Sequence, residues 1–205
     1  LPGVESQNAY ALYLMAGTLA WNLFSEIIQR SLTLFIEQAN LMKKVRFPRI
    51  ALPAILLGSC ILSNLLLFLS ILLIFTFMGH PPGLKALWIP LLTIPLVLLA
   101  TGLGLILGIL NVFIRDVGQI VPVIMQVLFW FTPIVYPSSI IPEAYQKFLI
   151  YNPMYLMVQG YQQVLVYDQS PGLMKIAVVG CVGLLLLFIG LFLFRRSGPE
   201  LVDAL

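Results

Sequence analysis

Charge is the scarcest property of this sequence. Lys, Arg, Asp and Glu together make up 9% of the 205 residues, whereas hydrophobic residues make up 60%. A soluble domain typically has about a quarter of its residues charged, so this composition excludes an ordinary soluble domain. The net charge of +3 is also too small to indicate a protein that binds nucleic acid.

The residue types that build catalytic and metal sites are scarce as well. His80 is the single histidine, and the two cysteines, Cys60 and Cys181, lie inside apolar runs. These cysteines indicate buried thiols rather than a disulfide or a zinc site. The glycine-rich segment 102–108 lacks the Lys and the Ser/Thr of a phosphate-binding loop, and its glycines favour close helix packing instead.

The apolar runs also lack the carboxylates of a proton relay. The sequence therefore predicts no catalytic residue, metal site or bound cofactor, and it argues against an ion-coupled carrier. If the chain takes part in active transport, the energy must come from another polypeptide.

Long apolar runs are what this sequence does contain. A helix needs about 20 predominantly apolar residues to cross a bilayer, whereas a barrel strand needs far fewer. We expect an all-α polytopic membrane protein whose single transmembrane domain covers the whole chain. Its spans are predicted at residues 10–28, 50–78, 84–112, 117–136 and 173–194.

Polar residues mark the end of the first predicted span. Glu26, Gln29 and Arg30 are expected where this span reaches water. The segment 31–40 mixes apolar and polar residues and predicts a short interfacial helix. Basic residues and Pro48 follow it, so a cytosolic loop is expected between the first two spans.

The segment 138–169 is too polar for a lipid-facing span and too apolar for a plain loop. Prolines suit the first position of a helix, and they predict two short helices here, Pro142 to Ile150 and Pro153 to Val166. Such re-entrant helices can dip into the membrane only where protein or water satisfies their backbone groups.

The basic residues indicate which face is cytosolic. If residues 138–169 do not cross the membrane, Lys85, Lys147 and Lys175 fall on one side. The larger set falls on the other side: Arg30, Lys43, Lys44, Arg46, Arg49, Arg115, Arg195 and Arg196. The positive-inside rule makes that side cytosolic and places the re-entrant helices outside. Leu1 is then external, and since no signal peptide is evident we expect one further span upstream.

Three motifs in fixed order carry a family resemblance. The segments 110–116 (LNVFIRD), 129–136 (FWFTPIVY) and 151–155 (YNPMY) together resemble the permease subunit of ABC-2 type polysaccharide exporters. The likeness extends upstream to 21–25 (WNLFS) and 47–49 (FPR). Those permeases move O-antigen, capsular polysaccharide or teichoic acid across the bacterial cytoplasmic membrane.

The resemblance implies the partners of this chain. Two copies would pair as a homodimer and bind two ATP-binding cassette subunits, which carry ATP and Mg²⁺. The substrate would be a lipid-linked polysaccharide, and the surroundings would be membrane lipids. Two alternatives stay open: an ABC-2 type drug or lipid exporter with the same layout, and a membrane-embedded glycan-processing enzyme. The latter would need clustered acidic or histidine residues, which the sequence lacks.

The region 31–49 is the expected contact with the ATPase, because the coupling helix of the family lies between these two spans. The alternative is a cationic loop that anchors at anionic lipid head groups. The pair Arg115 and Asp116 either adds a second contact or caps the following helix, where Asp116 suits the helix dipole; we favour the cap. The predicted coupling residues are Phe35, Lys43, Lys44, Arg46, Phe47, Arg49, Arg115 and Asp116.

Gln119, Gln126 and Trp130 share one face of the predicted fourth span. Amides can bind sugar hydroxyls and aromatic rings can stack on sugars, so we predict that these residues and Tyr136 line a sugar conduit. The alternative is ordinary helix–helix hydrogen bonding beside an interfacial aromatic belt. The residues of a predicted external gate follow the same reasoning and the same alternative: Tyr145, Tyr151, Asn152 and Tyr155.

Overall fold

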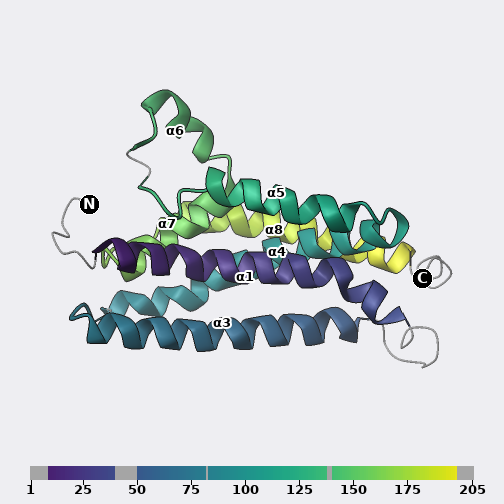
Figure 1. Cartoon of the computed structure of the whole chain (residues 1–205), viewed down its shortest axis with the longest axis horizontal. Coiled ribbons are helices and arrows are strands. Elements are labelled where there is room, and N and C mark those ends of the chain that lie inside the picture. The colour runs from purple at the N-terminus through teal and green to yellow at the C-terminus, as the bar shows by residue number, and fades with distance from the viewer. Residues whose placement is uncertain (1–8, 40–49, 82, 138–139, 198–205) are drawn as a thin grey trace.

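The computed structural model of the chain describes residues 9–39, 50–81, 83–137 and 140–197. Within these ranges the chain is helical and contains no strand (Figure 1). The all-α polytopic fold is therefore confirmed. The elements are α1 (Ala9–Glu37), α3 (Ala51–Phe77), the 3-10 helix η1 (Leu84–Trp88), α4 (Ile89–Phe113), α5 (Val117–Phe131), α6 (Glu143–Leu149), α7 (Pro153–Leu165) and α8 (Leu173–Arg196).

Four helical stretches of the described chain are long and apolar enough to cross a membrane: α1, α3, η1 together with α4, and α8. They run side by side along the long axis of the molecule (Figure 1). The fifth apolar helix, α5, has only 15 residues. At 1.5 Å per residue it measures about 22 Å, which is less than the thickness of a bilayer's hydrocarbon core.

Helix α4 packs against both α1 and α8, and glycines allow the backbones to approach closely. A Cβ at Gly102 of α4 would lie 2.4 Å from the backbone nitrogen of Leu187 in α8. A Cβ at Gly108 would lie 2.4 Å from the backbone oxygen of Ser31 in α1. Small residues of this kind let membrane helices pack through their backbones, so α1, α4 and α8 form the central layer of the bundle.

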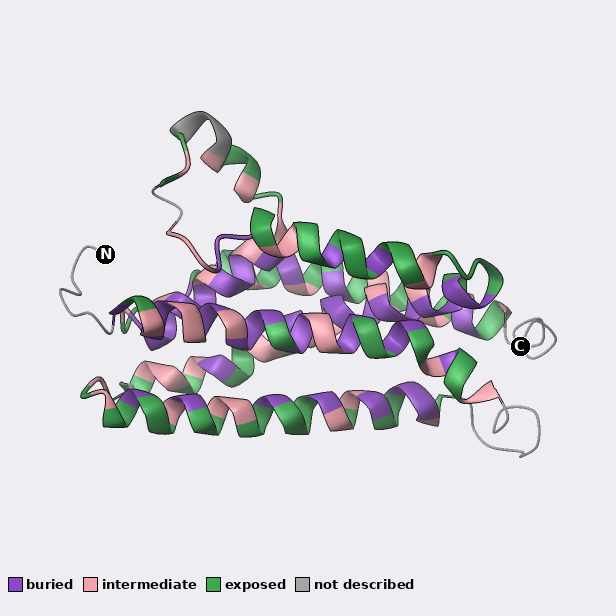
Figure 2. Ribbon diagram, viewed as in Figure 1, coloured by how far each residue is buried: buried purple, intermediate pink, exposed green. Residues whose placement is uncertain are grey.

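Helix α3 covers one edge of α1 and keeps an outer face of apolar side chains. Leu62, Leu66 and Leu69 are each more than half exposed on this face (Figure 2). An exposed apolar surface of this kind marks a face that contacts lipid or another protein rather than water. Figure 1 shows α5 along the other edge of α1, so that α1 lies between α3 and α5.

The first helix differs from the prediction, because no separate interfacial helix exists at residues 31–37. These residues continue α1 without a break. Ser31 and Phe35 are buried, and the Phe35 ring stacks on Phe194 of α8 with 5.5 Å between ring centroids. Tertiary packing therefore extends the helix beyond the apolar run that predicted it.

Helix α5 is shorter than the span predicted at residues 117–136. It ends at Phe131, and Thr132 already has an extended backbone. Pro133 has no backbone N–H to continue the helix, and the Thr132 hydroxyl donates to the Leu128 carbonyl within the last turn, at 2.8 Å. Residues 132–136 therefore form a non-helical segment, which we call the exit segment.

The two helices expected within residues 138–169 are present as α6 and α7. Helix α6 projects away from the bundle, whereas α7 packs into it (Figure 1). Met157, Val158 and Tyr161 of α7 are each fully or almost fully buried. Whether these helices lie on the external side of a membrane stays a prediction.

The two ends of the bundle differ in composition, and we call them the basic end and the tyrosine end. At the basic end α1, α4 and α8 finish and α3 and α5 begin, and Arg115, Arg195 and Arg196 are exposed there. At the opposite, tyrosine end lie the start of α1, the exit segment and α7. Tyr10 and Tyr13 belong to this end.

Candidate functional site

A polar stripe runs along α1 inside an otherwise apolar bundle. Thr18, Asn22, Ser25 and Gln29 follow one another at spacings of four, three and four residues, which places them on one face of the helix. Asn22 and Gln29 are exposed, and Thr18 and Ser25 are half-buried. Leu23 and Ile27, in contrast, point into the core. Polar residues within a membrane helix normally face protein or a water-filled cavity, so this face is the first candidate for a substrate path.

Hollows lie on both sides of this stripe. One of about 530 Å³ opens between α1 and α5, and one of about 350 Å³ opens between α1 and α3. Asn22, Ser25 and Gln29 line both hollows. The two hollows together are called the α1 trough, which is lined by α1 and bounded by α3 on one side and by α5 on the other. Figure 1 shows the order of these three helices.

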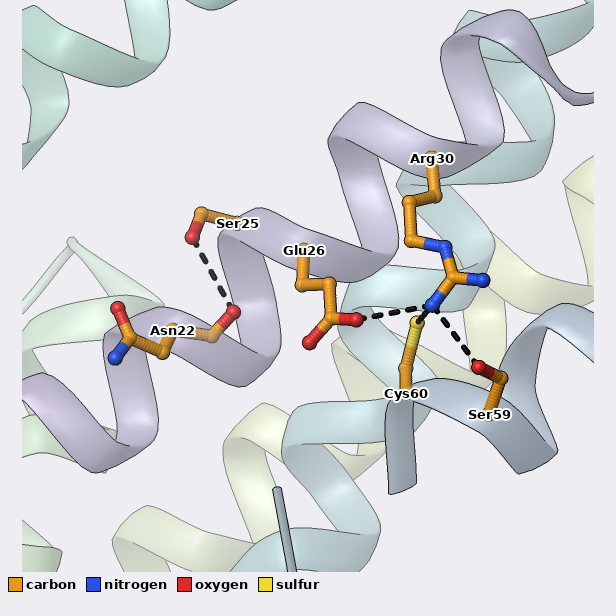
Figure 3. Close-up of polar contacts among 6 residues, drawn as sticks. All are labelled: Asn22, Ser25, Glu26, Arg30, Ser59 and Cys60. Atoms are coloured by element: carbon orange, nitrogen blue, oxygen red, sulfur yellow. Dashed lines mark hydrogen bonds and ion pairs between the residues drawn. The ribbon is translucent and has the colours of Figure 1, made fainter. Parts of the chain in front are cut away.

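The α3 side of the trough contains an ion pair. Arg30 Nη1 lies 3.0 Å from Glu26 Oε1 and 3.1 Å from the hydroxyl of Ser59 in α3 (Figure 3). The same nitrogen donates to Cys60 Sγ at 3.6 Å. Ser59 is eight residues beyond the first residue of α3, or about 12 Å along the helix. The pair therefore lies well inside the bundle from the basic end.

Glu26 and Arg30 were predicted to mark the point where the first span reaches water, and their depth in a membrane stays a prediction. The helix continues to Glu37, and α3 runs beside the pair. Charges inside a membrane protein are costly unless they pair or meet water, and they usually mark functional sites. A search for apolar runs treats such residues as boundaries, so only the heptad-like spacing of the polar stripe could have revealed this face.

The α5 side of the trough is aromatic. Trp21 of α1 packs edge-on against Phe129 of α5, with ring centroids 5.4 Å apart, and Phe129 contacts Trp130 in the same manner at 5.7 Å. Trp130 is 59% exposed and lines the hollow together with Gln126. Gln119 is also exposed but does not line this hollow. The structure thus brings two of the predicted conduit residues to the trough.

Tyrosine hydroxyls fasten the exit segment to α1 and α5. Tyr10 donates to the Val135 carbonyl at 2.9 Å, and the hydroxyl of Tyr13 lies 3.4 Å from the carbonyls of Pro133 and Tyr136. Tyr136 in turn donates to the Trp130 carbonyl at 2.7 Å. Tyr136, predicted as a conduit residue, therefore has a structural contact with the last turn of α5.

The predicted gate residues differ in their surroundings. Asn152 accepts from the Met154 backbone to cap α7, and it donates to the Thr132 hydroxyl at 3.1 Å. Tyr155 packs against the core, and Tyr151 is 84% exposed. The side chain of Tyr145 lies outside the described part of the structure. Their role as a gate stays a prediction.

The predicted coupling residues separate into three groups. Lys43, Lys44, Arg46, Phe47 and Arg49 lie outside the described residues.

Phe35 is fully buried against α8, so any part that it takes in coupling would act through the packing of α1 on α8, and its coupling role stays a prediction. Arg115 and Asp116 are both exposed at the basic end. Among the described residues they form no ion pair with each other, and Asp116 occupies the N-cap position of α5 without a side-chain hydrogen bond. Asp116 therefore lies where its charge suits the helix dipole, although it makes no capping hydrogen bond, and contact of this pair with a partner stays a prediction.

The described residues contain no group of three or more His, Cys, Asp or Glu side chains that could hold a metal ion. The side chains that line the candidate site are amides, hydroxyls, one ion pair and aromatic rings. A known protein family matches most of this chain. The model described as "ABC-2 type transporter" matches residues 2–166. The chain belongs to the ABC-2 type transporter family.

Three proteins similar to this chain carry names of polysaccharide export or transport proteins. The chain is 31% identical over 196 residues to an O-antigen export system permease protein RfbA of Klebsiella pneumoniae, and the match covers 91% of the chain and 72% of the relative. A protein of the same name from Myxococcus xanthus is 25% identical and is covered over 76% of its length, with 96% of this chain aligned. The polysialic acid transport protein KpsM of Escherichia coli is 23% identical over 53% of the chain and 42% of its own length.

This ABC-2 chain is thus a multi-pass membrane protein of a transporter family whose members work with an ATP-binding cassette partner.

Proposed function

We propose that this chain is the membrane-spanning permease subunit of an ATP-driven transporter that exports lipid-linked polysaccharide across the bacterial cytoplasmic membrane. The observation that carries the proposal is the α1 trough. Its amides and hydroxyls can exchange hydrogen bonds with sugar hydroxyls, and the exposed Trp130 can stack on sugar rings. The names of the relatives, O-antigen and polysialic acid export proteins, support the same substrate class.

The basic end would face the cytosol and the ATPase. Its exposed arginines, Arg115, Arg195 and Arg196, support this orientation because cytosolic loops carry excess positive charge. Arg115 lies in the short connection between α4 and α5. A push from the ATPase at this connection would act on α5, which forms the aromatic wall of the trough.

Two copies of the chain would enclose the sugar path. In one copy the trough has a floor and two walls, and it is open on the remaining side. Helix α5 also exposes apolar residues such as Ile120, Val123 and Val127, and it buries only Val121 and Met125. A second copy over this face would cover those side chains and close the trough into a conduit.

Each part of the chain then has a role in transport. Polar groups on the floor would replace the water around sugar hydroxyls, and the rings of Trp130 and Phe129 would offer sliding contacts without strong hydrogen bonds. The exit segment, held by Tyr10 and Tyr13, would fix where the aromatic wall ends. No covalent step is required of this chain, and ATP hydrolysis would take place on the partner.

The test is removal of the gene from its own host, followed by measurement of polysaccharide inside and outside the cell. We expect the surface polymer to disappear and its lipid-linked form to accumulate inside, and a plasmid copy to restore export. A purified complex should contain an ATPase subunit. Unchanged surface polymer in the deletion strain would contradict the proposed function.

A further inference from the structure

The ion pair in the α1 trough uses only part of its hydrogen-bonding capacity. Arg30 Nη1 makes every contact of the guanidinium among the described residues, to Glu26, Ser59 and Cys60. The Nε and Nη2 donors of Arg30 make no hydrogen bond to these described residues. The side chains of Arg30 and Glu26 are 44% and 33% exposed, and both line the hollow of about 350 Å³. The lining of this hollow therefore includes a charged hydrogen-bond donor and a charged acceptor.

Further hydrogen-bond donors and acceptors surround the ion pair. The amides of Asn22 and Gln29 line the same hollow, and each can donate and accept. Ser63 of α3 adds a hydroxyl on the opposite wall. A ligand that matches this hollow must present donors and acceptors side by side, as neighbouring hydroxyl groups do.

The paired charges disfavour other classes of ligand. A phosphate or carboxylate on Arg30 would lie close to the Glu26 carboxylate and be repelled by it, and a cation on Glu26 would be repelled by Arg30 in the same way. A hydrocarbon chain would leave both charges without water or hydrogen bonds, which is very costly. A neutral polyol satisfies both partners without breaking their ion pair.

We propose that Glu26 and Arg30 form a subsite for a neutral sugar unit of the exported polymer. Ser63 and the amides of Asn22 and Gln29 complete this subsite on the α3 side of the trough. This inference rests on the proposed function, and it names the residues that would bind one sugar unit. Because the pair lies nearer the basic end than Trp130 does, it is the earlier of the two contacts for a polymer that enters from that end.

The alternative role for the pair is purely structural, since Arg30 also joins α1 to α3 through Ser59. The two roles predict different results for replacement by apolar side chains. Exchange of a complete ion pair for well-packed apolar residues is often neutral or stabilising for a fold. The double variant E26L/R30L therefore removes the hydrogen-bonding groups while it keeps apolar packing between α1 and α3.

For E26L/R30L we expect a melting temperature of the purified complex equal to or above that of the wild type. We expect export of the host's polymer to fall about 10- to 100-fold, because hydrogen bonds from charged groups to the sugar are lost. The matched control is L62A/L66A on the outer face of α3, which lies away from the trough. Wild-type export by E26L/R30L would overturn the subsite.

A second experiment does not depend on the stability of that variant. A small diazirine-bearing residue replaces Ser63 on the trough wall or Leu65, which lines the groove between α3 and α4 on the other flank of α3. The cells are illuminated during export, and the permease is examined for attached glycan. We expect glycan at position 63 and none at position 65. No glycan at position 63, or equal capture at both positions, would overturn the subsite.

The two proposals fail in different ways. If the subsite is wrong but the function is right, the deletion strain still loses its surface polymer while E26L/R30L exports normally. If the function itself is wrong, the deletion strain keeps its surface polymer and neither crosslinking position captures glycan.

Discussion

Trp130 is 59% exposed on the wall of the α1 trough, so its truncation leaves no buried cavity. We expect W130A to keep the melting temperature of the complex, whereas a packed tryptophan would cost about 3–5 kcal/mol on truncation. Export should fall, because a stacking surface on the sugar path is lost. The two measurements are surface polymer and thermal unfolding of the same purified complex.

Phe131 provides the matched control for this experiment. It is 69% exposed, lies next to Trp130 in the chain and does not line the trough. F131A should therefore export normally if Trp130 acts through the sugar path. Equal losses in both variants would indicate that any exposed ring on α5 is needed, for example for contact between two copies.

Asn111 joins three helices near the basic end. Its Nδ2 donates to the Leu32 carbonyl of α1 at 2.8 Å, and the side chain is 3% exposed. Its Oδ1 is buried without a hydrogen-bond partner among the described residues, and it would lie 2.7 Å from a Cβ at Gly118 of α5. The amide therefore bonds to one helix and limits the side-chain size on another.

We expect N111A to lower the free energy of unfolding by about 1–3 kcal/mol, since the Leu32 carbonyl loses its donor. G118A should also destabilise, because its methyl group collides with the amide. In the double variant the methyl group occupies the vacated space, so the combined loss should be smaller than the sum. Strictly additive losses in denaturant unfolding would show that the two positions do not touch.

At the scale of the elements, membrane orientation is the first property to test. We expect cysteine probes at Arg115 and Arg195 to react only with reagent in the cytosol, and probes at Lys85 and Lys175 only with external reagent. The reason is the excess of arginine at the basic end. The native cysteines Cys60 and Cys181 are replaced before the probes are introduced, so that only the probe can react with the reagent. External labelling at Arg195 would mean that the segment with α6 and α7 crosses the membrane.

The connection between α4 and α5 is the described part of the chain best placed for contact with an ATPase. R115E should reduce co-purification of the ATPase and export by about tenfold or more, because a reversed charge at an interface costs several kcal/mol. R196E reverses an exposed charge at the same end of the bundle, outside this connection, and should have little effect. A normal complex with R115E would leave the undescribed residues 40–49 as the remaining contact.

Helix positions were predictable where a local signal determines them. Pro153 fits the first position of α7, and Asn152 caps it, so its start follows from the sequence. The end of α1 was not predictable in this way. Residues 31–37 stay helical because Phe35 stacks on Phe194, which lies far away in the sequence. Similarly, the exit segment depends on Tyr10 and Tyr13, which belong to another helix.

In the candidate site, too, some residues were predictable from local sequence and others were not. Gln126 and Trp130 were predicted because they share a face of one helix, and that information is local. The ion pair of Glu26 and Arg30 was assigned to the water boundary, because hydropathy alone cannot see that Ser59 of a second helix faces it. Exposed and buried phenylalanines also look alike in a sequence, so the burial of Phe35 needed the structure.

At the scale of the whole molecule, the close backbone contact between α4 and α8 separates a rigid part of the bundle from a part that can move more easily. A Cβ at Gly183 of α8 would lie 2.7 Å from the Leu99 nitrogen of α4, and Gly102 makes the reciprocal approach. Helices packed this closely cannot slide without collision. Helix α5, which buries few residues, can move far more easily. The layer of α1, α4 and α8 is therefore the rigid part of the chain, and a transport movement within this chain would be made by α5 against that layer.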